Sequence, residues 1–184
     1  MRRLFIGFIC LFLMSCVQTT QDEVQPEYGV IVVGQPSYFS NVKTFSWHPV
    51  AAKAFLDSNN LGRKALRVYK EAIENDLMDK GYQYMDTPNT DVVVSFGLAQ
   101  ESQLSDETLY RGTSLSTGVE TFYYDNKEAE KGSVYIVFFG RNLNIPDWRV
   151  LAQGAMAPKF NQEERVNRAT QVVSMMLRKV PNAY

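Results

Sequence analysis

Two stretches of the chain carry apolar residues at helical spacing, and they predict two long helices. In residues 61–80, apolar side chains recur every three or four positions, with charged residues on the opposite side. Residues 161–179 repeat this spacing, and Asn161 with Glu164 has the form of a capping box. A glycine follows the first stretch and a proline follows the second, as at many helix ends. The pattern therefore predicts one helix over residues 61–80 and another over residues 161–179.

Apolar residues at alternate positions, and short runs of β-branched or apolar residues, predict strands in much of the remaining chain; the run at residues 28–33 is an edge strand or an extended lead-in. Pro49 ends the second of these strands, and a turn around Pro146 joins the last two as an antiparallel hairpin. Residues 100–116 are polar and predict a long loop. The predicted strands cover residues 28–33, 42–47, 91–99, 118–124, 133–140 and 148–156.

The order of these elements predicts the fold class. A strand, a helix, a strand, a meander of strands and a final helix follow one another along the chain. Helices that are grouped in this way pack on a sheet whose neighbouring strands are mainly antiparallel. We therefore expect an α+β fold: a two-layer sandwich in which two helices pack on one face of a mainly antiparallel sheet.

The strand predicted at residues 133–140 is apolar on both faces. Such a strand lies at the centre of a sheet, or its outer face needs cover. If both helices cover one face, the other face must meet the polar segment 100–116, a protein partner or a lipid. The candidate partner or lipid face consists of Tyr135, Val137 and Phe139, or of the residues that alternate with them.

The first sixteen residues resemble a secretory signal that ends in a lipidated cysteine. Arg2 and Arg3 precede an apolar run over residues 4–13, which has the length of a signal core and is shorter than the ~20 residues of a spanning helix. Residues 13–16, Leu-Met-Ser-Cys, resemble a bacterial lipobox. This resemblance implies a lipid on Cys16 and cleavage directly before it. An ordinary cleaved signal that leaves a free thiol is the alternative.

These features divide the chain into three parts. We expect a signal peptide over residues 1–15, the lipidated Cys16 with a polar tether and lead-in over 16–36, and a single α+β domain over 37–184. Two acyl chains anchor a protein stably to a membrane, whereas one gives marginal binding. Val17, and no aspartate, follows Cys16, which by the enterobacterial rule favours the outer membrane. We expect the domain to be anchored there and to face the periplasm.

Charge and cysteine content exclude two classes of protein. The chain has 19 basic and 20 acidic side chains, and loss of Arg2 and Arg3 with the signal leaves 17 basic side chains and a net charge of −3. A nucleic-acid-binding protein needs a strongly basic face, so we expect no nucleic-acid partner. Cys10 leaves with the signal, so Cys16 remains alone and a disulfide framework is excluded.

Catalytic motifs are not visible in the chain. His48 is the single histidine and stands at a predicted strand end, next to Pro49. No nucleophile elbow accompanies it, no His and Cys residues have metal-ligand spacing, and no phosphate-binding loop occurs. A pair of carboxylates that converge only in the fold cannot be detected in this way. We expect no enzymatic activity, no metal and no cofactor.

Three segments together resemble a family of bacterial envelope lipoproteins known as domain of unknown function 4136. They are residues 38–47 with a Lys-Thr-Phe-Ser-Trp strand, residues 73–99 with Lys-Gly-Tyr and Asp-Val-Val-Val, and the last hairpin with its helix. The likeness covers residues 37–181, except for 100–116. It implies a lipobox, which is present here, and it brings no catalytic residues.

The expected function is that of a membrane-anchored envelope lipoprotein without enzymatic activity. It would act as an accessory protein, a scaffold or a binding module, with the membrane as one partner through Cys16 and an envelope protein as another. A lipid or glycolipid carrier is the first alternative, and an envelope hydrolase ranks last. The oligomeric state is left open.

Overall fold

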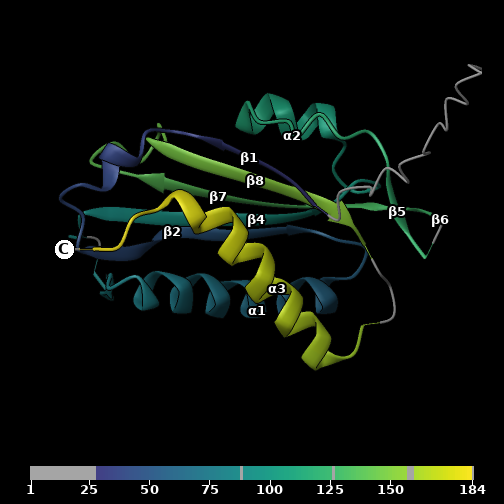
Figure 1. Ribbon diagram of the computed structural model, residues 1–184, viewed down its shortest axis with the longest axis horizontal. Coiled ribbons are helices and arrows are strands. Elements are labelled where there is room, and N and C mark those ends of the chain that lie inside the picture. Colours follow the sequence, from purple (N-terminus) through teal and green to yellow (C-terminus); the bar gives the residue numbers. More distant parts are fainter. Residues whose placement is uncertain (1–27, 88, 126, 157–159, 184) are drawn as a thin grey trace, which may run out of the picture.

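The computed structural model describes residues 28–87, 89–125, 127–156 and 160–183 (Figure 1). The predicted signal over residues 1–15, Cys16 and the tether before Tyr28 lie outside the described residues. None of the described helices is both long and apolar enough to span a membrane.

The main sheet has six strands in the order β1-β8-β7-β4-β2-β3. The first four of these pair antiparallel with their neighbours, whereas β4, β2 and β3 run parallel. A second sheet is the antiparallel hairpin β5–β6. The strands are β1 Tyr28–Val33, β2 Thr44–Phe55, β3 Gln83–Tyr84, β4 Val92–Gln100, β5 Phe122–Tyr124, β6 Lys127–Ala129, β7 Lys131–Phe139 and β8 Trp148–Ala155.

In the described part of the chain, three helices accompany the sheet: α1 Asn59–Asp79, α2 Asp106–Thr113 and α3 Gln162–Met176. Short 3-10 turns lie at Pro36–Phe39 and Leu177–Lys179. Helix α1 connects β2 to β4, and these strands are parallel because a helical crossover returns the chain to the same end of the sheet. The capping box at the start of α3 is confirmed, since the Asn161 side chain accepts from the Glu164 N–H at 3.0 Å and Glu164 accepts from the Asn161 N–H at 2.8 Å.

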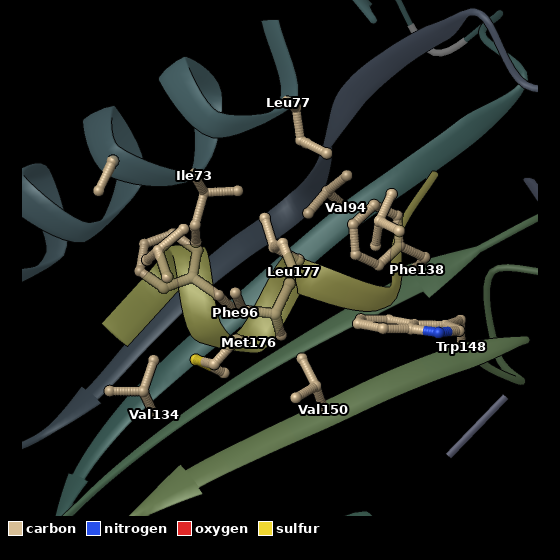
Figure 2. Close-up of a cluster of buried hydrophobic side chains, with 14 of the residues drawn as sticks. Ile73, Leu77, Val94, Phe96, Val134, Phe138, Trp148, Val150, Met176 and Leu177 are labelled. Carbon is tan, nitrogen blue, oxygen red and sulfur yellow. The ribbon is translucent and has the colours of Figure 1, made fainter. Parts of the chain in front are cut away.

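The main core lies between one face of the sheet and helices α1 and α3. We call this face, which carries Val134, Ile136 and Phe138 of β7, the near face. Figure 2 shows side chains from both helices pointing at the apolar residues of β4, β7 and β8. The labelled members of this core are Ile73, Leu77, Val94, Phe96, Val134, Phe138, Trp148, Val150, Met176 and Leu177.

Helix α2 lies on the opposite side, which we call the far face (Figure 1). The expectation of a loop over residues 100–116 is therefore wrong. Ser105 caps the helix by accepting from the Thr108 N–H at 3.3 Å, and Ser114 ends it in a left-handed conformation with φ 55°. Eight residues make little more than two turns, so only Leu109 of the helix is buried and no helical period is visible.

The fold class is confirmed, and the layer description needs correction. The chain is α+β and its sheet is mainly antiparallel. Because α2 adds a partial third layer on the far face, a two-layer sandwich does not describe the whole domain. Strand β2 is also longer than predicted. It continues through Pro49 because a bulge shifts its register with β4 between Trp47 and Ala52.

Candidate functional site

The predicted residues Tyr135, Val137 and Phe139 lie on the far face, because they alternate with the near-face residues of β7. Tyr135 packs against the small cluster formed by Leu109, Leu115 and Leu151. Leu109 and Leu115 belong to the segment that was expected to be a loop. One of the three predicted residues therefore contacts α2 and the chain that follows it.

A glycine allows Tyr135 to lie close to the sheet. Gly97 is its partner on β4, and a Cβ built on Gly97 would overlap the Tyr135 ring. The ring therefore lies across a strand position that has no side chain. Burial raises the pKa of the Tyr135 hydroxyl above its usual value, because the phenolate would lose its hydration.

Val137 and Phe139 have neighbours from other elements. Val137 is 9% exposed and pairs with Arg149, whose Nη1 donates to the Thr113 carbonyl at the end of α2, at 3.0 Å. Phe139 lies against the ring of His48, with centroids 5.4 Å apart and planes inclined by 38°. Along β7, Tyr135 thus lies next to α2, Val137 next to Arg149, and Phe139 next to His48.

His48 lies within the bulge of β2. Its Nδ1 accepts a hydrogen bond from the Val50 N–H at 3.1 Å, so this local bond supports the bulge. Its ring contact with Phe139 attaches the bulge to the far face. Both contacts are typical of a histidine that stabilises a loop.

A network of polar side chains fixes α2 over the sheet, and we call it the polar clamp. Lys131 is 3% exposed, and its Nζ lies 2.5 Å from Asp106 Oδ2 at the first turn of α2. Gln153 is also 3% exposed, and its Nε2 donates to Asp106 Oδ1 at 2.8 Å and to Ser133 Oγ at 3.0 Å. Its Oε1 accepts from Thr117 Oγ1 at 2.5 Å. The clamp joins β7, β8, α2 and the segment after α2.

A second polar group lies at the same end of the sheet. Gln100 Nε2 donates to Asp57 Oδ2 at 2.8 Å and to Glu130 Oε2 at 2.6 Å. Asp57 also accepts from Gln103 Nε2 at 2.7 Å. These bonds connect the β2–α1 turn with the ends of β4 and β6. The carboxylates are held by amide donors, and no group of three His, Cys, Asp or Glu within the described parts of the chain is placed to hold a metal ion.

An open groove of about 650 Å³ lies on the exposed side of α3, beside the first residue of β1. Its lining residues come from the first position of β1 and from the exposed side of α3: Tyr28, Thr170, Gln171, Ser174 and Met175. We call it the edge groove. Strand β1 is the outermost strand of the sheet, and among the described strands it pairs with β8 alone. The groove therefore adjoins the start of β1, whose outer backbone groups face away from the sheet.

Sequence reasoning missed the polar clamp and the edge groove. A signal for α2 was present, since Ser105 precedes Asp106 and Glu107, and a capping residue with acidic residues in the first turn indicates a helix start. No comparable signal marks Lys131. A lysine at the first position of a strand is usually exposed, and only the position of Asp106 across the fold explains its burial.

Several solved structures resemble this chain at low identity. The PelC dodecamer from Paraburkholderia phytofirmans is 9% identical, with a TM-score of 0.49, over 85% of this chain and 99% of that one. A PDZ domain protein from Parabacteroides distasonis is 18% identical, with a TM-score of 0.46, over 86% of this chain and 36% of that one. Protein XCC0632 from Xanthomonas campestris is 7% identical, with a TM-score of 0.43, over 82% of this chain and 86% of that one. Structural likenesses this weak indicate neither an activity nor an assembly for this chain.

A search of curated proteins finds no significant match. A family match, by contrast, extends over residues 33–182 and so includes both helices of the near face, α2 and the whole main sheet apart from most of β1. The chain belongs to the family described as domain of unknown function, DUF4136.

Proposed function

We propose that this protein is a membrane-tethered binding module of the bacterial cell envelope, without enzymatic activity, which receives an extended polypeptide segment along strand β1. The single observation that carries the proposal is the outer side of β1, with which no other described strand pairs, next to the edge groove. An extended segment can add to such an edge as a further strand. Main-chain hydrogen bonds then supply affinity, and pockets for alternate side chains supply specificity.

The composition of β1 supports this role. Natural edge strands are commonly protected by lysine, proline or a bulge, because an unprotected edge pairs with other chains. The sequence of β1 is Tyr-Gly-Val-Ile-Val-Val, which contains none of these protections. Val30 and Val33 are each 38% exposed. The strand has the character of a pairing edge.

The edge groove would receive the side chains of the added strand. Tyr28 and Val32 pack against the near-face core, so Val30, which lies between them by alternation, faces the same side as the groove. Met175 on α3 is 38% exposed and flexible enough to fit different side chains. Thr170, Gln171 and Ser174 add polar groups on the same side of the helix. An open groove lined by both apolar and polar side chains suits a peptide better than a lipid chain, which needs enclosure.

The location is proposed from the sequence. The lipobox-like residues 13–16 support lipidation of Cys16, and Val17 after it favours the outer membrane. Labelled palmitate is expected to mark the wild-type protein and to leave a Cys16→Ala variant unmarked and soluble. A wild-type protein that takes up no label and stays soluble would contradict the membrane anchor.

Site-specific photocrosslinking in cells tests the binding module. A photoreactive phenylalanine analogue at Val30 or Met175 is expected to link to one partner polypeptide, and peptide mapping should place the link in an extended segment. The matched control is the same analogue at Val166, which is 41% exposed on α3 and does not line the edge groove. Equal crosslinking at all three positions would contradict the proposal. A link to lipid alone at Val30 and Met175 would support a carrier instead.

A further inference from the structure

The hairpin β5–β6 stands beside the point at which the chain enters the fold. Figure 1 shows it at the end of the sheet where β8 ends, and Tyr28 pairs with Gly154 there. Tyr28 is the twelfth residue after Cys16. Twelve residues of extended chain reach about 40 Å at most. A lipid on Cys16 would therefore hold this end of the domain near the bilayer, and we call it the tether end.

A continuous row of ring contacts joins the hairpin to the chain entry. The Arg168 guanidinium lies over the Tyr28 ring at 4.7 Å and over the Phe160 ring at 5.2 Å. Phe160 in turn meets Tyr124 of the hairpin edge-to-face, with centroids 6.1 Å apart. Arg168 also donates to the Ala155 carbonyl at 2.9 Å, which fixes it to the end of β8. The hairpin thus has a defined position relative to the entry of the tether.

The hairpin presents two tyrosines to solvent. Phe122 is 2% exposed and fixes the hairpin to the domain, whereas Tyr123 is 50% exposed and Tyr124 is 45% exposed. Lys127 pairs opposite Tyr124 and is exposed. A tyrosine has an apolar ring and a polar hydroxyl, and for this reason tyrosines are enriched where hydrocarbon meets the headgroups of a membrane. A lysine beside them can lay its aliphatic part on the same layer with its ammonium in water.

We propose that the end of the β5–β6 hairpin, which carries Tyr123 on one face and the exposed part of the Tyr124 ring on the other, inserts into the headgroup region of the bilayer and gives the tethered domain a second contact with the membrane. This inference rests on the proposed membrane anchor. A second contact fixes the orientation of the domain, since a lipid on a polar tether alone leaves it free to rotate. The edge groove begins at Tyr28, so its distance from the bilayer would be fixed as well.

The charges around the hairpin specify the kind of lipid surface. Within residues 120–130, Glu120, Asp125, Glu128 and Glu130 are exposed and acidic and Lys127 is basic, while Arg165 and Arg168 contact Phe160 beside the hairpin, so acidic residues remain in excess. Such a surface is not attracted to anionic lipid, so the contact depends on the aromatic rings. We expect it to form on zwitterionic lipid and to be insensitive to salt. The affinity of two tyrosines for lipid is too low to bring an untethered protein to the membrane. A tether raises the effective concentration of the hairpin at the bilayer surface to the millimolar range, so this low affinity suffices.

Fluorescence quenching by brominated phosphatidylcholine tests this contact. The mature chain from Cys16 is attached to vesicles in two ways: as the lipidated protein, and through the Cys16 thiol on a maleimide-bearing lipid. A Tyr123→Trp variant should show an added tryptophan emission that is blue-shifted and reduced at least twofold by the brominated lipid, in 0.1 M and in 0.5 M salt. A Tyr124→Trp variant repeats the measurement if the first does not fold.

The matched control is Ile145→Trp. Ile145 is 63% exposed in the turn between β7 and β8, at the opposite end of the sheet, and its added emission should be unaffected by the brominated lipid. Equal quenching of the three variants, or none, on vesicles that retain the protein would overturn the proposal, as would quenching that is lost in 0.5 M salt. If Cys16 is not lipidated, only the first form of attachment is lost. The protein that is coupled through its thiol still tests whether the hairpin contacts the membrane.

Discussion

The two faces of the sheet are stabilised by different kinds of contact. On the near face, α1 and α3 bury a continuous set of apolar side chains, with Phe96, Ile136 and Trp148 each at most 1% exposed. On the far face, α2 and the chain after it bury the small set Leu109 and Leu115 against Leu151 and Tyr135, and the polar clamp with the bond from Arg149 to the Thr113 carbonyl adds polar contacts. The near face forms a core in the ordinary sense, whereas the far face is a small apolar cluster with hydrogen bonds around it.

This difference indicates which part of the domain can change shape. Apolar burial over a long interface makes the near-face elements one cooperative unit, because every helix turn adds contacts. A short helix fixed by a few polar groups can open by itself when the bonds of one lysine or one glutamine are lost. We therefore expect substitutions on the near face to unfold the domain and substitutions on the far face to release α2.

The largest effect is expected for Phe96→Ala. Phe96 is 1% exposed in β4, and its removal leaves a cavity in the near-face core, which costs about 3–5 kcal/mol of unfolding free energy. Urea denaturation followed by circular dichroism measures the loss. Tyr110→Ala is the control, since Tyr110 is 55% exposed on α2 and should cost at most about 0.5 kcal/mol. Equal losses in the two variants would contradict the contrast between the faces.

A smaller and local effect is expected for Lys131→Met. The substitution leaves Asp106 without its cation, and because the Asp106 side chain is 43% exposed it can regain water, so the cost should be about 2 kcal/mol. Hydrogen exchange should accelerate in residues 109–113 and stay slow in residues 92–98. Lys127→Met, at an exposed lysine, should change neither segment. Acceleration throughout the sheet would show that the faces are not independent.

Gly97→Ala tests whether the position of the Tyr135 ring requires a residue without a side chain beneath it on β4. A methyl group at residue 97 displaces the ring and disturbs its packing on Leu109, with an expected cost of about 1–2 kcal/mol. Gly112→Ala is the matched control, because nothing lies within 4 Å of its added Cβ and alanine favours a helix. Thermal melting should shift down for the first variant and slightly up for the second. Shifts of the same sign would contradict the proposed role of Gly97.

The smallest effect is expected at Asp91, which joins the starts of β2 and β4 by exposed hydrogen bonds. Its Oδ2 accepts from the Lys43 N–H, the Thr44 N–H and Thr44 Oγ1, each at 2.9 Å. The Lys43 N–H, followed by the bonds of Thr44, lowers the pKa of the Asp91 carboxyl below its ordinary value, against the opposing effect of burial. Asp91→Asn should cost about 1 kcal/mol at pH 7.

The contribution of Asp91 to the free energy of unfolding should fall as the pH is lowered. Because the pKa of Asp91 is lower in the folded state than in the unfolded state, its stabilisation is complete above the unfolded value near 4 and is lost as the pH falls through the folded value. Urea midpoints of the wild type and Asp91→Asn should therefore differ at pH 7 and converge toward pH 2. Glu120→Gln, at an exposed residue, should follow the wild type at every pH. A difference that persists at pH 2 would show that the carboxylate charge is not responsible.

The sequence predicted the near-face elements well because burial requires a regular pattern. Helix α1 covers Asn59–Asp79 where residues 61–80 were predicted, and α3 with the turn after it covers Gln162–Lys179 where residues 161–179 were predicted. Strands β1, β4, β7 and β8 also lie where apolar and β-branched runs were predicted as strands. The two helices bury one side each, so their buried positions recur at the helical period, whereas β4, β7 and β8 are buried on both faces and read as nearly continuous apolar runs.

The sequence alone determined the fold class, the two long helices and the need of β7 for cover on a face beyond the one that the helices take, because each depends on neighbours within one element. Only the tertiary structure decided what covers that face. Lys131 and Asp106 are 25 positions apart, and Gln153 and Thr117 are 36 apart, so their hydrogen bonds leave no local period. The tertiary structure also decided that β1 is an edge strand and that the β5–β6 hairpin lies at the tether end. Both depend on contacts between segments that are far apart in the sequence.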